Sequence, residues 1–335
     1  MTLAPTVRDH VDTYQDSDYD SVTAQVEELE QLGYFGDTSL DLDRTRQATI
    51  DRANPATAEL TRRVPGFDAW LDLIPTAAAL DLCYDPLGTA LPNGAPITPA
   101  MSTWARNLAD TRGIRSRAAV FRQLALEHAD ATSLPQRWLS LACGAAHPAI
   151  STARHLREQG GCVARLDLVD LDRTALALAE TYAEREQVSE LVRTHRMNVL
   201  DRAGLRAPGL DQTPQLLPGY DLVEAIGLLE YLGADDWSYS YAGVIRTRRL
   251  LAGARTFLQN AWRLVNPGGL LVVGNMLDTH PQLRFTLNVV QWPHIRPRPV
   301  TDLLTLLDEA GIHGHRRVVL PADGVYALYA VRKDS

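Results

Sequence analysis

Short apolar runs alternate with amphipathic segments from Arg137 to the end of the chain. Runs of strand type occupy residues 137–143, 163–171, 191–199, 220–227, 269–276, 315–321 and 325–332. Helical periodicity marks the segments between them at 148–159, 173–186, 246–265 and 300–311. Strands that alternate with helices of this length predict βαβ units, and therefore a parallel sheet with helices on both faces. The short turn Pro-Ala-Asp-Gly before the last strand predicts that the final two strands form an antiparallel hairpin.

The N-terminal part of the chain shows helical periodicity without strand-type runs. Apolar residues recur at helical spacing over 22–32. Further helices are expected at 44–63, 67–82 and 113–130. Residues 82–101 are dense in Pro and Gly, which indicates a long connection. The pattern predicts two domains, a helical one at 1–130 and an α/β one at 131–335.

The composition limits the chemistry. The chain has 33 Lys and Arg residues, and Lys333 is the only lysine among them. P-loop NTPases, protein kinases and pyridoxal-phosphate enzymes each need an internal lysine, so these classes are excluded. With 45% hydrophobic and 22% charged residues, the chain has the composition of a soluble globular protein with a substantial core.

The sequence contains no recognisable targeting or metal-binding pattern. No apolar run approaches the roughly 18 residues of a membrane span, and the N-terminus lacks the apolar stretch of a secretory signal. Cys83, Cys143 and Cys162 are scattered, without the spacing of a zinc site or a disulfide framework. We therefore expect a reduced, cytoplasmic protein that binds neither a membrane nor a metal.

Charge is distributed unevenly along the chain, whose formal net charge is −8. Residues 1–130 carry 20 acidic residues and 11 arginines, whereas the remainder is close to neutral. Eleven acids and no base lie from Asp9 to Asp43, a pattern typical of a solvated helix face or a mobile arm. A nucleic-acid-binding protein would present a basic surface, so we expect no nucleic-acid partner.

Candidate ligand-binding residues stand at the carboxyl ends of the predicted strands. The first strand runs into a turn of small residues, 142–146, whose backbone can approach a ligand and whose following helix presents free N–H groups. Asp170 ends the second strand, where a carboxylate can accept hydrogen bonds from ribose hydroxyls. Asn198 ends the third strand with an amide that suits an adenine edge. An ordinary βα turn and a helix N-cap are the alternatives, although Asp172 fits the N-cap role better.

Five motifs follow one another in a fixed order over residues 131–335. They read LSLACGAA, LVDLD, MNVLD, YDLVEAIGLLEYL and NPGGLLVVGN. In this order they resemble the class I S-adenosylmethionine-dependent methyltransferase family. The resemblance implies an α/β fold with a seven-stranded Rossmann-like sheet of order 3-2-1-4-5-7-6 and an antiparallel last strand. It also implies S-adenosyl-L-methionine as the cofactor that donates the methyl group.

The resemblance further implies which residues bind the donor. By position they are Ala142, Cys143 and Gly144 for the methionine part, Asp170 for the ribose, Leu171, Asn198 and Val199 for the adenine, and Ile226 and Gly227 for the sulfonium. The first motif departs from the family pattern, because alanines stand where the second and third glycines are usual. In the preceding helix, Arg115 or Arg117 is a candidate partner for the donor carboxylate, with a salt bridge to the acidic N-terminal region as the alternative.

Aromatic residues gather in two segments that follow the fourth and fifth strands, at 231–241 and 277–304. Such clusters suit a pocket for a small, mostly apolar acceptor, with packing of a lid onto the core as the alternative. The candidates for a base or for an orienting group are Glu230, Tyr231, Asn275 and His294. No constellation resembles that of a metal-dependent methyltransferase.

The sequence therefore predicts a methyltransferase that acts on a small, largely apolar or aromatic metabolite, as in bacterial secondary or fatty-acid-type metabolism. Two alternatives stay open: an RNA- or protein-modifying methyltransferase, and a protein that binds the donor without transferring its methyl group. A nicotinamide dehydrogenase would require a fuller glycine motif. The expected partner is the small-molecule acceptor, and the assembly stays open, with a homodimer as one alternative.

Overall fold

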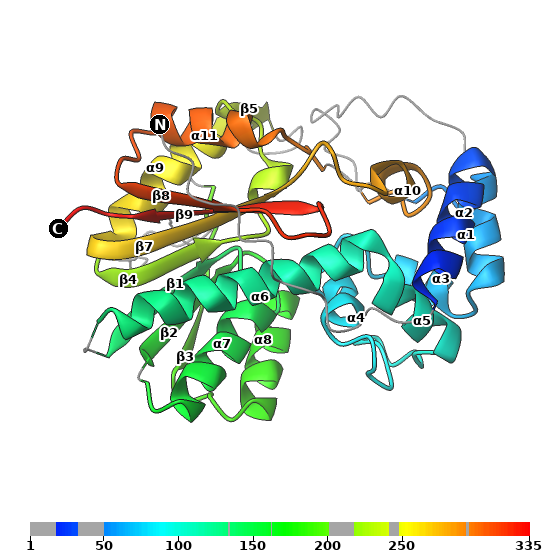
Figure 1. Cartoon of the computed structure of the whole chain (residues 1–335), viewed down its shortest axis with the longest axis horizontal. Coiled ribbons are helices and arrows are strands. Elements are labelled where there is room, and N and C mark those ends of the chain that lie inside the picture. The colour runs from blue at the N-terminus through cyan, green and yellow to red at the C-terminus, as the bar shows by residue number, and fades with distance from the viewer. Residues whose placement is uncertain are drawn as a thin grey trace.

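A seven-stranded sheet forms the centre of the structure, with helices on both of its faces (Figure 1). The computed structural model describes residues 18–32, 50–132, 135–161, 163–200, 218–240, 248–292 and 295–335. The strands of this sheet are β1 Gln136–Leu141, β2 Val163–Asp170, β3 Val192–Arg196, β4 Tyr220–Ala225, β7 Val265–Met276, β8 His315–Val319 and β9 Tyr326–Arg332. In space they follow the order β3-β2-β1-β4-β7-β9-β8. Because β7, β8 and β9 are the fifth, sixth and seventh strands of this sheet along the chain, the predicted order 3-2-1-4-5-7-6 is confirmed.

The strand directions also agree with the sequence pattern. The pairs β1–β2, β1–β4, β2–β3 and β4–β7 are parallel, whereas β9 runs antiparallel to both β7 and β8. The expected antiparallel hairpin at the end of the chain is therefore present. Since parallel strands direct their carboxyl ends to one edge of a sheet, the ends of β1, β2 and β4 lie together, where ligands bind in open α/β folds.

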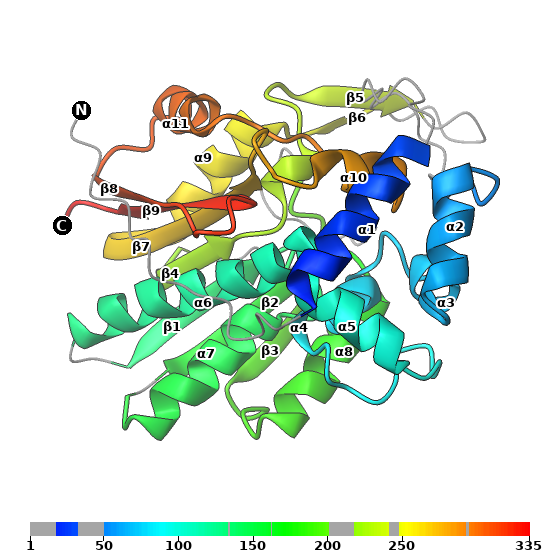
Figure 2. The same ribbon diagram turned by 45° about the vertical axis from the view of Figure 1, so that its right-hand side comes forward.

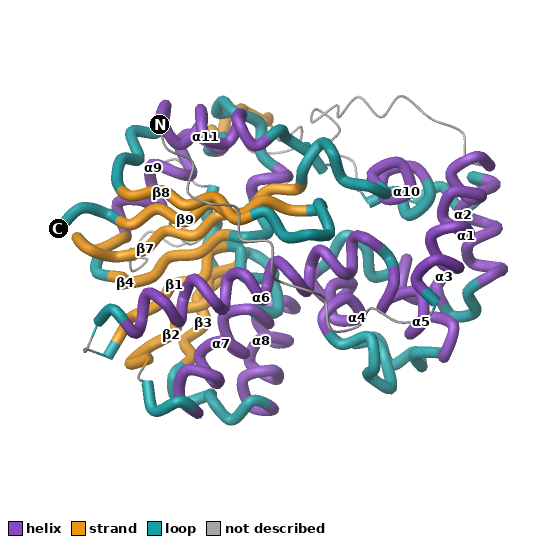
Figure 3. The backbone as a smooth tube through the Cα atoms, viewed as in Figure 1, coloured by secondary structure: helices purple, strands orange, loops and turns teal. Residues whose placement is uncertain are grey.

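Alternate residues of each strand pack on opposite faces of the sheet. The covering helices are α6 Ala109–Asp130, α7 His147–Glu158, α8 Arg173–Arg185, α9 Ala254–Leu264 and α11 Val300–Glu309. Trp138 and Leu222 pack with α6 and α7 on one face, and Leu139 and Val223 pack with α9 and α11 on the other. The resulting layers of helix, sheet and helix are visible in Figure 3. Both faces are apolar because each is buried under helices.

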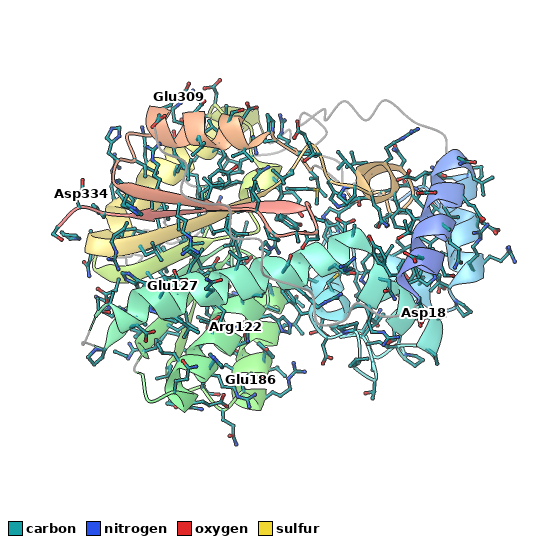
Figure 4. The ribbon with its side chains drawn as sticks, viewed as in Figure 1. Asp18, Arg122, Glu127, Glu186, Glu309 and Asp334 are labelled. Atoms are coloured by element: carbon teal, nitrogen blue, oxygen red, sulfur yellow. The ribbon has the colours of Figure 1, made fainter. Side chains whose placement is uncertain are left out.

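Ion pairs join neighbouring helices at the surface of each outer layer. Arg154 of α7 lies 2.6 Å from Glu186, which follows α8, and Arg255 of α9 lies 2.7 Å from Glu309 of α11. The two glutamates mark the outer edges of opposite layers (Figure 4). Exposed ion pairs contribute about 1 kcal/mol or less each. The apolar clusters between sheet and helices therefore dominate the stability of the fold.

The N-terminal residues form a set of helices beside the sheet. They are α1 Tyr19–Leu32, α2 Pro55–Arg63, α3 Phe67–Leu71, the 3-10 helix η1 Ala77–Leu80, α4 Asp81–Tyr84 and α5 Pro99–Asn107. Their buried residues belong to one continuous hydrophobic cluster that extends to Ala330 in the sheet. Helix α1 also packs against α10, Leu283–Asn288, where Glu30 accepts a hydrogen bond of 2.8 Å from the backbone N–H of Phe285 (Figure 2). The segment after β7 is thus held between the sheet and the N-terminal helices.

One predicted helix is partly a strand. The sequence pattern predicts a single helix over 246–265, but residues Arg248–Leu251 form strand β6, and α9 begins only after it. Strand β6 pairs antiparallel with β5, Trp237–Ser240, in a separate small sheet. A side chain at Gly253 would place its Cβ 2.2 Å from the carbonyl oxygen of Asp235. This close backbone approach breaks the helical pattern, and only glycine permits it.

Helix α5 lies partly inside the predicted long connection. Thr98 is its N-cap and accepts a hydrogen bond of 3.2 Å from the backbone N–H of Met101. Pro99 occupies the first turn, where a missing N–H costs nothing. The pair Thr-Pro is a helix-start signal that apolar periodicity does not reveal.

Candidate functional site

The turn after β1 has an unusual backbone. Ala142, Gly144 and Ala146 adopt left-handed conformations, with φ of 51°, 54° and 55°. L-residues other than glycine rarely adopt this conformation, so two alanines are held here in strained positions. The turn leads directly into α7, which directs its first N–H groups toward the carboxyl edge of the sheet. Strain of this kind is typical of ligand-binding turns.

Asp170 at the end of β2 is joined to this turn. One of its carboxylate oxygens accepts a hydrogen bond of 2.9 Å from the backbone N–H of Gly144. The other accepts one of 2.9 Å from the N–H of Asp172, which caps α8. Two motifs separated in the sequence are therefore in direct contact. The role of Asp170 toward a ribose stays a prediction.

A first cavity of about 460 Å³ opens beside the turn. It is lined by Ala77, Leu80, Tyr84, Arg117, Ala142, Cys143, Gly144, Ala145, Ala146, His147, Pro148, Glu224, Ile226 and Gly227. The turn after β1 and the end of β4 form one side, and η1 with α4 forms the other. The structure thus brings five of the predicted donor-binding residues to one cavity: Ala142, Cys143, Gly144, Ile226 and Gly227.

A second cavity of about 550 Å³ adjoins the first. It is lined by Trp70, Leu80, Cys83, Leu108, Asp110, Thr111, Ile114, Arg117, Gly227, Glu230, Tyr231, Met276, Thr286, Val290, Trp292, Ile295 and Tyr326. Leu80, Arg117 and Gly227 line both cavities. A molecule in the second cavity would therefore meet a molecule in the first at this shared boundary.

Comparisons with known proteins give structural matches only. No family model matches the chain, and no curated protein matches it in sequence. A possible exported protein from Bordetella parapertussis is 17% identical, with 96% of this chain and 99% of that chain covered and a TM-score of 0.60. The CMeT domain of the citrinin polyketide synthase is 15% identical, with 96% and 80% covered and a TM-score of 0.49. An O-methyltransferase family protein from Burkholderia thailandensis is 20% identical, with 68% and 61% covered and a TM-score of 0.42.

The order of the strands, with β9 antiparallel between β7 and β8, identifies the fold. The five sequence motifs fall on the strands and turns where the family resemblance requires them. The chain therefore has the Rossmann-like fold that its resemblance to the class I S-adenosylmethionine-dependent methyltransferases implies. Within this fold, the first cavity occupies the carboxyl ends of β1 and β4, and the second lies on the side of the N-terminal helices.

Glu224 lines the first cavity, and the sequence reasoning missed it. It lies in β4 opposite Ser140 of β1. Ser140 donates a hydrogen bond to one carboxylate oxygen, and the backbone N–H of Ile226 donates one of 3.0 Å to the other. Burial raises the pKa of Glu224, and the described residues form no ion pair with it. An acidic residue inside a strand buried on both faces was the available signal.

His147 is a second residue that the sequence reasoning did not select. Its ring lies between Tyr84 and Tyr182, with centroids 4.8 Å and 4.0 Å away. Its Nε2 lies 3.0 Å from a carboxylate oxygen of Asp81. The histidine thereby fixes α4 against the start of α7, and so holds the wall of the first cavity opposite the turn after β1.

The two candidate arginines of α6 have different surroundings. The guanidinium of Arg115 donates hydrogen bonds to the backbone carbonyls of Cys83, Ala105 and Arg106, at 2.9, 3.0 and 2.8 Å. These contacts join α6 to the N-terminal helices, and Arg115 does not line either cavity. Arg117 does line both. Of the two candidates, only Arg117 is placed to reach a ligand in either cavity, and its role toward the donor stays a prediction.

Arg117 forms a buried ion pair with Glu230. The two side chains are each 4% exposed, and Nη1 of Arg117 lies 3.5 Å from Oε1 of Glu230. The guanidinium also stacks over the ring of Tyr326, 4.5 Å from its centroid, and donates a hydrogen bond of 3.4 Å to the hydroxyl of Tyr84. Burial raises the pKa of Glu230, although Arg117 opposes this shift. The pair places a carboxylate and a cation together at the boundary between the cavities.

Asp110 supplies a further carboxylate to the second cavity. The Nδ1 of His280 accepts a hydrogen bond of 2.9 Å from the N–H of Gln282, so the proton of a neutral His280 is on Nε2. That nitrogen lies 2.8 Å from one oxygen of Asp110, and Thr286 donates a hydrogen bond to the other. Both oxygens of Asp110 are occupied, so its carboxylate is fixed in place.

The remaining predicted residues are distributed as follows. Tyr231 lines the second cavity, and its hydroxyl accepts a hydrogen bond of 2.8 Å from Nε1 of Trp292. Asn275 is buried outside the lining, where it donates to the carbonyl of Met276 and accepts a hydrogen bond of 2.7 Å from Arg298. These hydrogen bonds satisfy the buried amide of Asn275 and connect β7 to Arg298. His294 lies outside the described residues.

The residues predicted for the adenine lie beyond the first cavity. Leu171 follows Asp170 and is 47% exposed, which is unusual for a leucine and suits a face that a ligand covers. Val199 is buried, and the side-chain oxygen of Asn198 accepts a hydrogen bond of 3.0 Å from the N–H of Leu200. Their roles toward the donor stay predictions.

Among the described residues, no group of three or more His, Cys, Asp or Glu side chains is arranged to hold a metal ion. Within the same residues, no helix is both long enough and apolar enough to cross a membrane.

Proposed function

We propose that the protein transfers the methyl group of S-adenosyl-L-methionine to a small, largely apolar or aromatic metabolite. The observation that carries this proposal is the pair of adjoining cavities on a methyltransferase fold, which share Leu80, Arg117 and Gly227. The first cavity suits the donor, and the second suits the acceptor. Methyl transfer requires the two molecules to meet in line, and alignment supplies much of the rate enhancement.

The residues of the first cavity fit the donor. Its methionine part carries an ammonium, and Glu224 offers a buried carboxylate without an ion pair among the described residues. A buried charge is costly unless a partner neutralises it, so an ammonium beside Glu224 would stabilise both groups. Arg117 lines the same cavity and offers a cation for the donor carboxylate. When bound, the donor supplies a methyl group that its own sulfonium already activates.

The second cavity fits a small apolar acceptor. Most of its lining is apolar or aromatic, and a few polar groups stand at defined points of the wall, as is usual for metabolite sites. Glu230 and Tyr231 are close to the shared boundary and would orient the reacting group. Thr286 of α10 lines this cavity, and α1 holds α10 in place through the hydrogen bond between Glu30 and the backbone N–H of Phe285.

The proposal is tested by binding and by turnover. We expect the protein to bind S-adenosylhomocysteine in isothermal titration calorimetry, and to methylate members of a panel of small aromatic compounds, as measured by mass spectrometry. Binding of the product analogue without methylation of any small molecule or macromolecule would instead favour a donor-binding protein. Absence of binding would refute the proposal.

An RNA- or protein-modifying enzyme is the less supported alternative. Its acceptor would have to present one group through an opening, whereas here the second cavity is walled by residues of the N-terminal helices and adjoins the first cavity. The acidic N-terminal region also disfavours RNA. We further propose a cytoplasmic location, which scattered cysteines support. A fluorescent fusion of the full chain would test it.

A further inference from the structure

We propose that the acceptor presents a phenolic hydroxyl, which Glu230 deprotonates while Arg117 stabilises the resulting oxyanion, so that the enzyme methylates oxygen. This inference rests on the proposed function and deepens it, because it names the substrate class and the attacking atom.

Two unsatisfied atoms in one ion pair carry the inference. Among the described residues, Oε2 of Glu230 and Nε of Arg117 are buried and have no hydrogen-bond partner. The first is an acceptor, and the second is a donor. Buried polar atoms without a partner are costly, and in native structures they often mark a ligand site. A hydroxyl group complements both, since it donates one hydrogen bond and accepts another.

The charges at the boundary favour oxygen over nitrogen. An amine acceptor becomes a cation when it is methylated, and it would form that cation beside the buried guanidinium of Arg117. A phenol instead develops negative charge on oxygen as it loses its proton, and the same guanidinium stabilises that charge. The electrostatic effect of Arg117 therefore assists one reaction and opposes the other.

The carboxylates of the second cavity exclude a third class of acceptor. Asp110 and Glu230 both line it, and the two oxygens of Asp110 are already occupied by His280 and Thr286. An acceptor with a carboxylate would meet two like charges and a single cation. A neutral acceptor avoids this repulsion.

The walls of the second cavity favour a flat ring. Trp70 and Trp292 both line it, with ring centroids 6.3 Å apart and an angle of 46° between their planes. Trp292 is fixed by its hydrogen bond to Tyr231, and Trp70 by one of 2.7 Å from its Nε1 to the carbonyl of Ala79. Two immobilised indole rings offer apolar faces to an aromatic acceptor.

The step balances without any further reactant. The hydroxyl proton moves to Oε2 of Glu230, and the phenolic oxygen uses its electron pair to form a bond to the methyl carbon. The bond between that carbon and sulfur breaks, and its electron pair stays on sulfur, which leaves as a neutral thioether. Glu230 then releases the proton to solvent. Its raised pKa suits this task, because a carboxylate of higher pKa is a stronger base.

The charged and titratable groups around Glu230 come from several elements. Glu230 itself lies on the 3-10 helix η2, which spans Leu229–Tyr231. The groups around it are Tyr231 on the same helix, Arg117 and Asp110 on α6, Tyr84 on α4, Tyr326 on β9, and Arg298 before α11. Burial raises the pKa of each of the three tyrosines, so none of them competes as a base near neutral pH.

Binding of four matched probes tests the acceptor class. The wild-type complex with S-adenosylhomocysteine is titrated with 2-naphthol, 2-naphthylamine, 2-naphthoic acid and 2-methoxynaphthalene. We expect 2-naphthol to bind at least about tenfold more tightly than the other three, because only its hydroxyl can satisfy both unpaired atoms. Equal affinities, or a preference for the amine or the acid, would overturn the inference.

The dependence of turnover on pH tests the role of Glu230. In Glu230→Gln we expect methylation of 2-naphthol to fall at least about 100-fold near neutral pH and to recover as the pH rises toward the pKa of the free phenol, since an ionised phenol needs no base. Wild type should reach its plateau at lower pH. Glu127→Gln on the outside of α6, where the side chain is 47% exposed, is the control and should match wild type. A Glu230→Gln profile that matches wild type would refute the role of the base.

The proposed function and the assignment of an oxygen acceptor are contradicted by different results. If wild type does not bind S-adenosylhomocysteine, the proposed function itself fails. If it binds S-adenosylhomocysteine but methylates 2-naphthylamine in preference to 2-naphthol, only the assignment of an oxygen acceptor fails.

Discussion

Arg117 and Glu230 form an ion pair of 3.5 Å whose side chains are each 4% exposed, at the point where the two cavities meet. One residue comes from the helix that precedes the sheet, and the other from the short segment that follows β4. A buried charge without a partner is costly, so each member of the pair offsets part of the desolvation cost of the other. The packing of α6 therefore fixes the position of the cation that lines both cavities.

Removal of Glu230 should destabilise the protein more than removal of Arg117. We expect Glu230→Gln to lower the free energy of unfolding by about 3 kcal/mol, because the guanidinium of Arg117 cannot lose its charge. In Arg117→Gln the remaining carboxyl can take up a proton. Urea denaturation followed by circular dichroism measures both variants.

The loss in Arg117→Gln should depend on pH. Burial already raises the pKa of Glu230 above its ordinary value of 4.5, and removal of the cation raises it further. A pKa that is higher in the folded state means that stability falls as the pH rises through the window above 4.5. Arg117→Gln should therefore be closer to wild type at about pH 5 than at about pH 8. An equal loss at both values would contradict this assignment.

Glu224 should determine the affinity for the amino-acid part of the donor. We expect Glu224→Gln to weaken binding of S-adenosylhomocysteine by roughly 10- to 100-fold, which corresponds to loss of a charged hydrogen bond. Binding of 5′-methylthioadenosine, which lacks the ammonium, should change little. Calorimetric titration of both ligands makes the comparison, and Glu309→Gln on the surface of α11 is the control. A similar loss for both ligands would indicate a structural effect instead.

Donor binding should also release protons. Burial raises the pKa of Glu224 in the free protein, and an ammonium at close range would lower it. Between the lower and the higher pKa, the free protein holds a proton that the complex does not. Calorimetry of S-adenosylhomocysteine binding in two buffers of different ionisation enthalpy measures this release at pH values above 4.5. The release should disappear in Glu224→Gln.

Asp170→Ala should weaken donor binding by roughly 1–3 kcal/mol through loss of charged hydrogen bonds. The same change leaves the N–H of Gly144 without its acceptor, so part of the loss reflects a less ordered turn. Asp170→Asn keeps one side-chain oxygen for that N–H and isolates the effect of charge. Wild-type affinity of Asp170→Ala for S-adenosylhomocysteine would show that the ribose assignment is wrong.

Gly113→Ala should be destabilising even though alanine is the better helix former. The new Cβ would lie 2.5 Å from the Cβ of Val325, at the start of the last hairpin strand. Helix propensity favours alanine by about 1 kcal/mol, whereas overpacking in a tight contact costs about 1–3 kcal/mol. The melting temperature should fall, and the double variant Gly113→Ala/Val325→Ala should recover part of the loss. An increase for Gly113→Ala alone would show that α6 can move away from the hairpin.

Much of the fold was predictable because its signals are local. Apolar runs and helical periods marked the seven strands of the main sheet, and the Pro-Ala-Asp-Gly turn marked the hairpin. The missed strand β6 lies where a helical period continues through Leu250 and Leu251, and its pairing with the nearby strand β5 overrides that period. The missed helix α5 had an N-cap signal but little apolar periodicity.

The site was predictable only in part. The turn after β1, Asp170, Ile226 and Gly227 follow from strand ends, which a parallel sheet gathers at one edge. Glu224 was missed because the register that places it opposite Ser140 is a property of paired strands. Asp110 was missed because its partners lie about 170 residues further along the chain.

The sequence by itself determined the alternation of strands and helices, the sheet order through its motifs, and the absence of lysine chemistry. These depend on periodicity and composition, which any stretch of chain carries locally. Only the tertiary structure decided that Arg117 and not Arg115 lines the cavities, although both sit in one helix two positions apart. Residues i and i+2 of a helix face different directions, and the packing of α6 between the sheet and the N-terminal helices selects which of them meets the ligand.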